Sequence, residues 1–234
     1  MSESRMYSYI CETPEVLRNI ICNRKEITEQ FTAYAKDKDI QQIYVLGSGT
    51  SYHAGLSAKN YLEELLGMKV FCMYPTQFER SEKVFNKHTL VIGMSQGGQS
   101  LSTVAGLDAA RKQGLYTAAV SENPSALIFE HADTRTLIQV GNEQCGAKTK
   151  GYAGTTVTLM MMLTELALEK GIVSKEKAEA YFERMYRVID NLGNVTKAAV
   201  EWYGRIRDEF LPAKRIIVVG YTGISRHDRG DFLP

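Results

Sequence analysis

The stretch Val91–Val104, VIGMSQGGQSLSTV, decides the fold class of this chain. The apolar run Leu90–Met94 leads directly into six small or polar residues, SQGGQS. An apolar pattern typical of a helix begins at Leu101. A buried strand, a tight turn and a helix start therefore follow one another, and this order is typical of a βαβ unit.

Short apolar runs alternate with helical patterns along most of the chain. The runs contain few polar residues, as expected for strands buried on both faces of a parallel sheet. We therefore predict an α/β fold, a doubly wound five-stranded parallel sheet flanked by helices, between roughly Gln42 and Val140. Ligands of such sheets bind at the carboxyl ends of the strands. The predicted strands are 40–47, 68–75, 88–95, 115–121 and 134–141.

The helical patterns begin and end at capping and terminating residues. Thr13–Pro14 begins the first helix, because a capping hydroxyl precedes proline at the first helical position. The run Leu159–Leu163, LMMML, is too short to span a membrane and predicts a buried core helix. The further predicted helices are 52–66, 100–113, 124–131, 152–170 and two amphipathic helices at 174–192 and 195–210.

The end of the chain predicts a second unit. The segment Lys214–Ser225, KRIIVVGYTGIS, is similar to Gln41–Ser51, QQIYVLGSGTS, and would contain a buried strand at Arg215–Val219. We divide the chain into a domain at 13–171, a helical linker at 172–211 and the start of a second, similar domain at 212–234. Because the chain ends shortly after Ser225, we expect it to be truncated there.

Composition excludes several classes of function. With 234 residues and a formal net charge of +1, the chain has no charge excess that would attract nucleic acid or an anionic membrane. Its four cysteines form no CxxC pair, which favours a reduced, cytoplasmic protein. We see no signal peptide, and the four histidines lack metal-ligand spacing. We therefore expect no metal and no cofactor.

Two strand-to-helix turns are rich in glycine and hydroxyl groups. The first lies within Tyr44–Gly55, YVLGSGTSYHAG, where Gly47 and Gly49 allow close backbone approach or positive φ. Ser51 starts the next helix, where free N–H groups favour an anion. Serine and glycine are also ordinary turn and cap residues, and this structural interpretation stays open for each turn alone.

The second turn offers hydroxyl, amide and backbone donors. Ser95 and Ser100 carry hydroxyls, Gln96 carries an amide, and we expect Gly97 and Gly98 to leave backbone N–H groups open. Neither turn contains a P-loop or a complete GxGxxG pattern, so a nucleotide site is not supported. Two such turns on neighbouring strands favour a ligand of the size of a phosphate.

The motifs GSGTSYHAG and SQGGQS, with NEQCGAKTKGYAGTT at Asn142–Thr156, resemble those of the sugar isomerase (SIS) domain family. The likeness is greatest to proteins with two SIS domains, namely the isomerase half of glucosamine-6-phosphate synthase and the fructosamine-6-phosphate deglycases. The resemblance covers Leu46 to about Lys170 and implies binding of a sugar phosphate.

The resemblance also implies site residues. By position, the phosphate ligands would be Ser51, Ser95, Gln96 and Ser100, with Gly49, Thr50, Gly97 and Gly98 contributing to the same turns. The family often has a hydroxyl at the position of Gly97 and an acid at that of Gln99. Losing one hydroxyl would weaken phosphate binding by the net value of one hydrogen bond, ~1 kcal/mol, and losing the acid would partly offset this effect, because the local charge is then less negative. Lys148 stands where small residues are common, and it either faces the ligand or is a solvated loop lysine.

No catalytic base can be named from the sequence. In the two-domain relatives the proton-transferring glutamate belongs to the second domain. Glu143 and Glu165 are candidate acid–base groups, although a surface carboxylate is the default interpretation. His53 either contacts the sugar or faces solvent.

Three functional hypotheses remain. The leading one is a sugar-phosphate isomerase or fructosamine-6-phosphate deglycase, which moves a proton between C1 and C2. The second is a non-catalytic sugar-phosphate-binding or regulatory module, and in the third the glycine turns are only turns. Because the helices offer more apolar surface than one sheet can cover, we also expect a homodimer.

Overall fold

A computed structural model describes residues 5–81 and 86–217 of the chain. The five predicted strands are present: β1 Gln42–Leu46, β2 Lys69–Met73, β3 Thr89–Met94, β4 Tyr116–Ser121 and β5 Thr134–Leu137. The helices are α1 Arg5–Cys22, α2 Arg24–Ala35, α3 Thr50–Leu66, α4 Pro75–Ser81, α5 Leu101–Lys112, α6 Lys150–Glu169 and α7 Lys175–Phe210, with a 3₁₀ turn η1 at Leu127–His131.

All five strands are parallel and lie in the order β2-β1-β3-β4-β5. The chain therefore crosses to one side after β1 and to the other after β3, so the carboxyl ends of these two neighbours form a topological switch point. Their register pairs Leu46 with Gly93, which places the two following turns side by side at one edge of the sheet.

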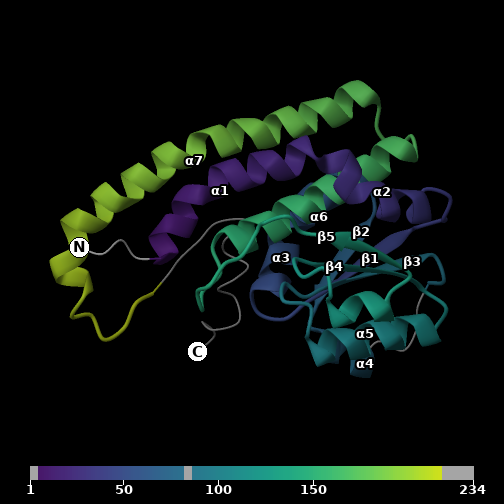
Figure 1. Ribbon diagram of the computed structural model, residues 1–234. Coiled ribbons are helices and arrows are strands. Elements are labelled where there is room, and N and C mark those ends of the chain that lie inside the picture. Colours follow the sequence, from purple (N-terminus) through teal and green to yellow (C-terminus); the bar gives the residue numbers. More distant parts are fainter. Residues whose placement is uncertain (1–4, 82–85, 218–234) are drawn as a thin grey trace.

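Helices cover both faces of the sheet (Figure 1). On one face α3 and α1 pack against α6, and α7 runs alongside α1; on the other face α4 packs against α5. The methionine-rich run is buried in this core, with Leu159, Met161, Met162 and Leu163 all inaccessible to solvent. The expected buried core helix is thus confirmed, and a doubly wound α/β sheet is the fold of the chain.

The N-terminal helix starts earlier than Thr13. Pro14 lies inside α1, and the Thr13 hydroxyl donates to the carbonyl oxygen of Tyr9 at 2.9 Å instead of capping a helix start. The side chains of Leu17, Ile20 and Ile21 are buried, so packing of α1 outweighs the loss of one backbone hydrogen bond at proline. The predicted start at Thr13 is wrong for that reason.

Two further segments differ from the sequence prediction. The helices predicted at 174–192 and 195–210 form one continuous helix, α7, that passes through Gly193. A glycine inside a helix costs only about 1 kcal/mol, which a 36-residue helix tolerates. The sequence pattern does not predict helix α4, because a proline after an apolar run indicates the end of a strand; Pro75 instead stands at the first position of a helix.

The predicted strand at 215–219 is not present in its described part. Residues 215–217 form no strand, and the side chains of Ile216 and Ile217 are exposed. Val218, Val219 and the remainder of the predicted second unit lie outside the described residues. The four cysteines are free, and within the described ranges no helix is long and apolar enough to cross a membrane.

Candidate functional site

The first turn, Gly47–Thr50, connects β1 to α3. Gly49 has a φ of +55°, in the left-handed region that favours glycine. A side chain at Gly47 would lie 2.8 Å from the backbone of Ser51, so this glycine is required by close approach. Within the described chain, the N–H groups of Gly49 and Thr50 donate to no backbone acceptor. The turn thus presents free donors at the start of a 17-residue helix.

The second turn, Ser95–Ser100, connects β3 to α5 and is held more tightly. The N–H of Gly98 donates to the carbonyl oxygen of Ser95 at 3.0 Å, and Gly98 has a φ of +76°. The expectation that Gly98 leaves its N–H open is therefore wrong, because that group closes the turn. Gly97 is exposed, and its N–H has no backbone acceptor in the described residues.

The serine side chains divide into free and engaged hydroxyls. Ser51 and Ser95 are 6% and 8% exposed, and their hydroxyls make no hydrogen bond to any described residue. Ser100 is the N-cap of α5 and accepts hydrogen bonds from the N–H and hydroxyl of Thr103. Ser100 is thus an ordinary helix cap, as one interpretation of these turns predicted. The nearly buried hydroxyls of Ser51 and Ser95 are available to a ligand.

The predicted residues Gln96 and Lys148 meet at a carboxylate that sequence reasoning did not single out. Nε2 of Gln96 donates to Oε2 of Glu122 at 2.8 Å, and Nζ of Lys148 lies 3.9 Å from Oε1 of the same group. Nζ of Lys148 also donates to the carbonyl oxygen of Glu143 at 2.8 Å. Lys148 is thus a half-buried lysine anchored beside the second turn, not a solvated one.

Glu143 organises the loop that leads into α6. Its carboxylate accepts from the N–H and hydroxyl of Thr149 at 2.7 and 2.6 Å and from the N–H of Gly151 at 2.9 Å. Burial alone would raise the pKa of Glu143, but these hydrogen bonds together lower it. The default interpretation as a surface carboxylate is therefore wrong, since Glu143 is 4% exposed.

Glycine also allows the loop to reach the turn. A side chain on Gly151 would lie 1.7 Å from Nε2 of Gln96, so α6 begins directly against the second turn. The preceding residue, Lys150, is turned away from this point, because its Nζ binds Glu12 at 2.7 Å. The start of α6 thus forms a wall of the site without adding the charge of Lys150 to it.

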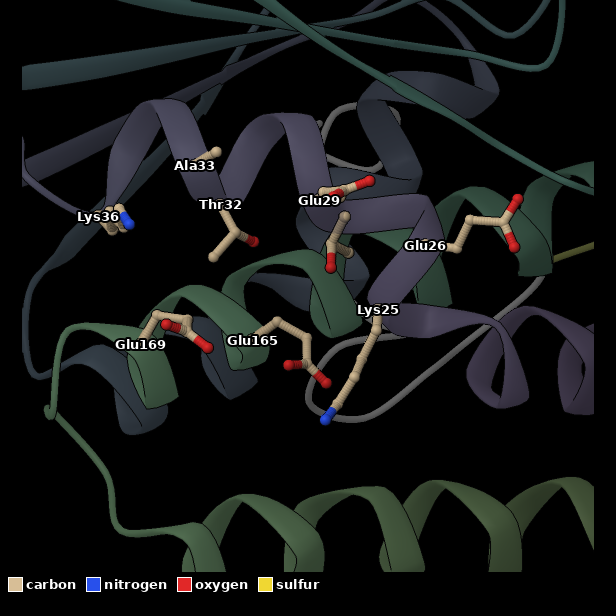
Figure 2. A pocket seen from close by; sticks show the side chains of 9 residues that line it. Lys25, Glu26, Glu29, Thr32, Ala33, Lys36, Glu165 and Glu169 are labelled. Carbon is tan, nitrogen blue, oxygen red and sulfur yellow. The ribbon is translucent and has the colours of Figure 1, made fainter.

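Glu165 lies elsewhere, in a hollow of about 440 Å³ between α2 and α6 (Figure 2). It is 15 residues along α6 from Lys150, about 22 Å at the usual helical rise. Burial raises the pKa of Glu165, and Arg24, bound at 2.8 Å, partly offsets that effect. This carboxylate is therefore not brought to the two turns. His53 lies in the first turn of α3, with a half-buried side chain.

The geometry suits a small anion better than a metal. Free N–H groups and the unengaged hydroxyl of Ser51 lie at the start of α3, and the unengaged hydroxyl of Ser95 lies in the second turn, at the end of the neighbouring strand. The ammonium group of Lys148 lies beside Glu122, which holds Gln96 of the same turn. No group of three histidine, cysteine or acidic side chains able to hold a metal ion occurs in the described parts of the chain.

The sequence pattern of the SIS domain matches residues 38–168. This range extends from just before β1 to the end of α6, and it includes both turns and the loop that carries Lys148. The match therefore covers the whole sheet and every residue of the candidate site.

Individual proteins are similar over most of the chain. The glutamine–fructose-6-phosphate aminotransferase (isomerizing) of Clostridium tetani is 31% identical over 191 residues, which are 79% of this chain and 31% of the relative. A solved protein from Clostridium difficile 630, proposed to be a phosphosugar isomerase, superposes with a TM-score of 0.80 at 36% identity over 87% of this chain and 57% of its own. Tagatose-6-phosphate ketose/aldose isomerase of Escherichia coli shares the fold, with a TM-score of 0.67 at 15% identity over 95% of this chain and 60% of its own.

Proposed function

The chain belongs to the SIS domain family, and from that premise we propose that it binds a sugar phosphate at the two turns. The observation that carries this proposal is the pair of nearly buried, unengaged hydroxyls of Ser51 and Ser95 at a topological switch point. The phosphate would accept from these hydroxyls and from the free N–H groups of Gly49, Thr50 and Gly97. Ser100 and Gln96 would complete the contacts.

Lys148 supplies the charge in this proposal. Hydroxyl and backbone donors are neutral, so an ammonium group beside the second turn offsets part of the phosphate's negative charge. Its hydrogen bond to the carbonyl of Glu143 fixes the ammonium group in that position. We therefore retain all the residues that were predicted from the sequence, with Gly98 acting through turn geometry rather than as a donor.

The test is a titration of fructose 6-phosphate into the protein, followed by calorimetry. Ser95→Ala should weaken binding by about 1–3 kcal/mol, because a hydrogen bond to a charged group is lost. The thermal midpoint without ligand should hardly change, since the hydroxyl binds no described residue. Unchanged affinity in Ser95→Ala would remove this residue from the site, and no binding by the unaltered chain would reject the proposal.

The reaction that we propose is that of a sugar-phosphate isomerase or a fructosamine-6-phosphate deglycase. Both move a proton between C1 and C2 of an opened sugar, and the turns would position the substrate for it. The names of the similar proteins support this class, since they include isomerising and ketose/aldose isomerase activities. The chain spans 31% of the C. tetani relative, so these whole-protein activities are proposals here.

One observation favours a binding module as the second candidate. The carboxylates beside the turns, Glu122 and Glu143, already accept hydrogen bonds from Gln96 and from Thr149 and Gly151. Neither is a free base. Incubation with fructose 6-phosphate separates the two candidates: formation of an aldose phosphate supports the isomerase, and binding without turnover supports the module.

We also propose a cytoplasmic homodimer. Four free cysteines fit a reducing compartment. The second half of α7 exposes large apolar side chains, among them Val195, Trp202 and Phe210, and a second copy of the chain would cover them. Light scattering at micromolar concentration should report twice the chain mass of 26.2 kDa, and a monomeric mass would reject the dimer.

A further inference from the structure

Lys150, the first residue of α6, is a buried lysine beside the candidate site. It is only 5% exposed, and a lysine is almost never buried to this extent unless its charge is paired. Its Nζ donates to Oε2 of Glu12 at 2.7 Å and lies 4.7 Å from the centre of the Tyr9 ring. An ion pair and a cation–π contact, both supplied by α1, therefore hold the charge of Lys150.

Helix α1 contacts the loop before α6 at a second point as well. Tyr9 and Glu12 are three residues apart and lie on one face of α1. The hydroxyl of Tyr9 accepts a hydrogen bond from the N–H of Gln144 at 3.0 Å. The two side chains thus contact the loop near its beginning, at Gln144, and at its end, at Lys150. Further along, α1 is anchored in the core by the buried side chains of Leu17, Ile20 and Ile21.

The ion pair between Lys150 and Glu12 is a weak source of stability. The Glu12 side chain is 47% exposed, and the loss of hydration at buried Lys150 offsets much of the attraction. An apolar side chain of similar volume can fill such a position at little cost in stability. What the pair does fix is a direction, because it holds Lys150 toward α1 and away from the second turn.

The direction of Lys150 determines where its neighbour Gly151 lies. A Cβ at Gly151 would stand 1.7 Å from Nε2 of Gln96, so the backbone of α6 touches the second turn with no room for a side chain. Release of Lys150 from α1 would let the first turn of α6 rotate, which either presses Gly151 against Gln96 or opens a gap there. The position of Gln96, a proposed phosphate contact, therefore depends on what holds Lys150.

We propose that Lys150 is a positioning residue of the phosphate site, and that Glu12 and Tyr9 hold it so that the start of α6 stays in contact with the second turn. Lys150 acts through Gly151 and Gln96 and does not bind the ligand. This inference rests on the proposed function, because Gln96 must belong to the ligand site. It also gives a role to α1, which lies outside the residues that the SIS pattern matches.

Two substitutions of Lys150 test this role by calorimetry with fructose 6-phosphate. Lys150→Met keeps a long side chain and removes the charge, so affinity should fall about tenfold while the thermal midpoint without ligand hardly changes. Lys150→Arg retains the charge and the contact with the Tyr9 ring, so its affinity should stay within about threefold of the unaltered chain. A purely structural role would lower the thermal midpoint and affinity together.

Glu12→Gln distinguishes positioning from direct binding. If Lys150 bound the phosphate, removing the charge of Glu12 would free its ammonium group for the ligand and strengthen binding. In the positioning role the same change weakens binding, and we expect about threefold. The double variant Glu12→Gln/Lys150→Met should bind no more weakly than Lys150→Met, because both changes remove one interaction.

Lys170→Met is the matched control at the opposite end of α6. Nζ of Lys170 donates to the carbonyl oxygens of Lys36 and Lys38, so this variant also releases a lysine of α6 from a neighbouring segment. Its affinity for fructose 6-phosphate should equal that of the unaltered chain.

The outcomes separate this inference from the proposed function. Unchanged affinity in Lys150→Met, tighter binding in Glu12→Gln, or an equal loss in Lys170→Met overturns the inference and leaves phosphate binding in place. Failure of the unaltered chain to bind fructose 6-phosphate overturns the proposed function itself. Thermal unfolding checks that each variant is folded, and Glu12→Gln, at an exposed position, decides alone if Lys150→Met does not fold.

Discussion

The two turns at the switch point have similar compositions but depend on glycine for different reasons. In the first turn Gly49 has open space around its Cα and is needed for its positive φ. In the second turn Gly98 also has a positive φ, yet a side chain there would lie 2.2 Å from Cβ of Ala126. At Gly49 glycine is thus needed for backbone conformation alone, whereas at Gly98 it is needed for packing as well.

This difference follows from what surrounds each turn. The second turn is enclosed by the end of β4, by the residues that follow it and by the loop at the start of α6. The first turn is open to solvent over residues 48–50. We therefore expect substitutions in the second turn and its supports to disturb the fold, and substitutions at the exposed residues 48–50 of the first turn to act mildly.

Gly98→Ala should have the largest effect. The left-handed conformation and the contact with Ala126 together should destabilise the protein by about 3 kcal/mol. Chemical denaturation of the unliganded chain measures this value. If Gly98→Ala proves no more destabilising than the matched change Gly49→Ala, the second turn is not set by packing.

Glu143→Gln should destabilise the protein by about 2 kcal/mol, because hydrogen bonds to a charged group are weakened. The pKa of Glu143 is lowered in the folded protein, so its stabilisation is complete above the ordinary value of 4.5 and is lost as the pH falls further. Denaturation curves at neutral pH and at pH values below 4.5 should show the two proteins converging in acid. A constant difference across this range would contradict the assigned role.

Gly49→Ala tests the open turn and should cost about 1–2 kcal/mol, the price of a left-handed alanine alone. No atom lies within 4 Å of the added carbon, so no packing cost should accompany it. Gly49→Asn serves as the control, because asparagine tolerates this conformation better and should recover part of the loss. A cost equal to that of Gly98→Ala would remove the distinction between the turns.

Ser100→Ala should have the smallest effect, about 1 kcal/mol, through loss of the N-cap of α5. The N-cap of α3 is Gly49, which has no side chain to act as a cap. The stability lost in Ser100→Ala therefore measures a contribution that the second turn has and the first lacks. Ser100→Gly should cost only a few tenths of a kcal/mol. Thermal unfolding without ligand gives both values, and equal losses would show that the cap is not the source of the effect.

The strands could be predicted because their signal is local. Val91 and Ile92 belong to an apolar run that ends at small residues, and short apolar runs also mark most of the other strands. The order of strands then places the two turns together, since parallel neighbours end at one edge. Ser51 and Ser95 could therefore be grouped as candidate residues before any coordinates were known.

The interpretations that were wrong depended on tertiary contacts. Pro14 and Gly193 predict interruptions when only the local sequence is considered, yet both lie inside helices. From the local sequence, Glu143 is expected to be a surface carboxylate. Its hydrogen-bond donors lie six and eight residues later and reach it only in the folded chain. Glu122 gave no signal, because its partners Gln96 and Lys148 are 26 residues away in each direction along the chain.

The length of α7 fixes how far its outer half lies from the sheet and which way its side chains face. At about 1.5 Å and 100° per residue, its 36 residues extend about 54 Å, while the buried positions end at Ile189. The outer half lies along α1 and beyond it in Figure 1. Because α7 is continuous, the position of this half and its rotation about the helix axis are fixed relative to the sheet. Inserting one residue at Gly193 would rotate Trp202 and Phe210 by about 100° around the axis without altering either turn. The number of residues in α7 therefore determines in which direction the apolar side chains of its outer half face, and so the orientation of any partner that packs against them.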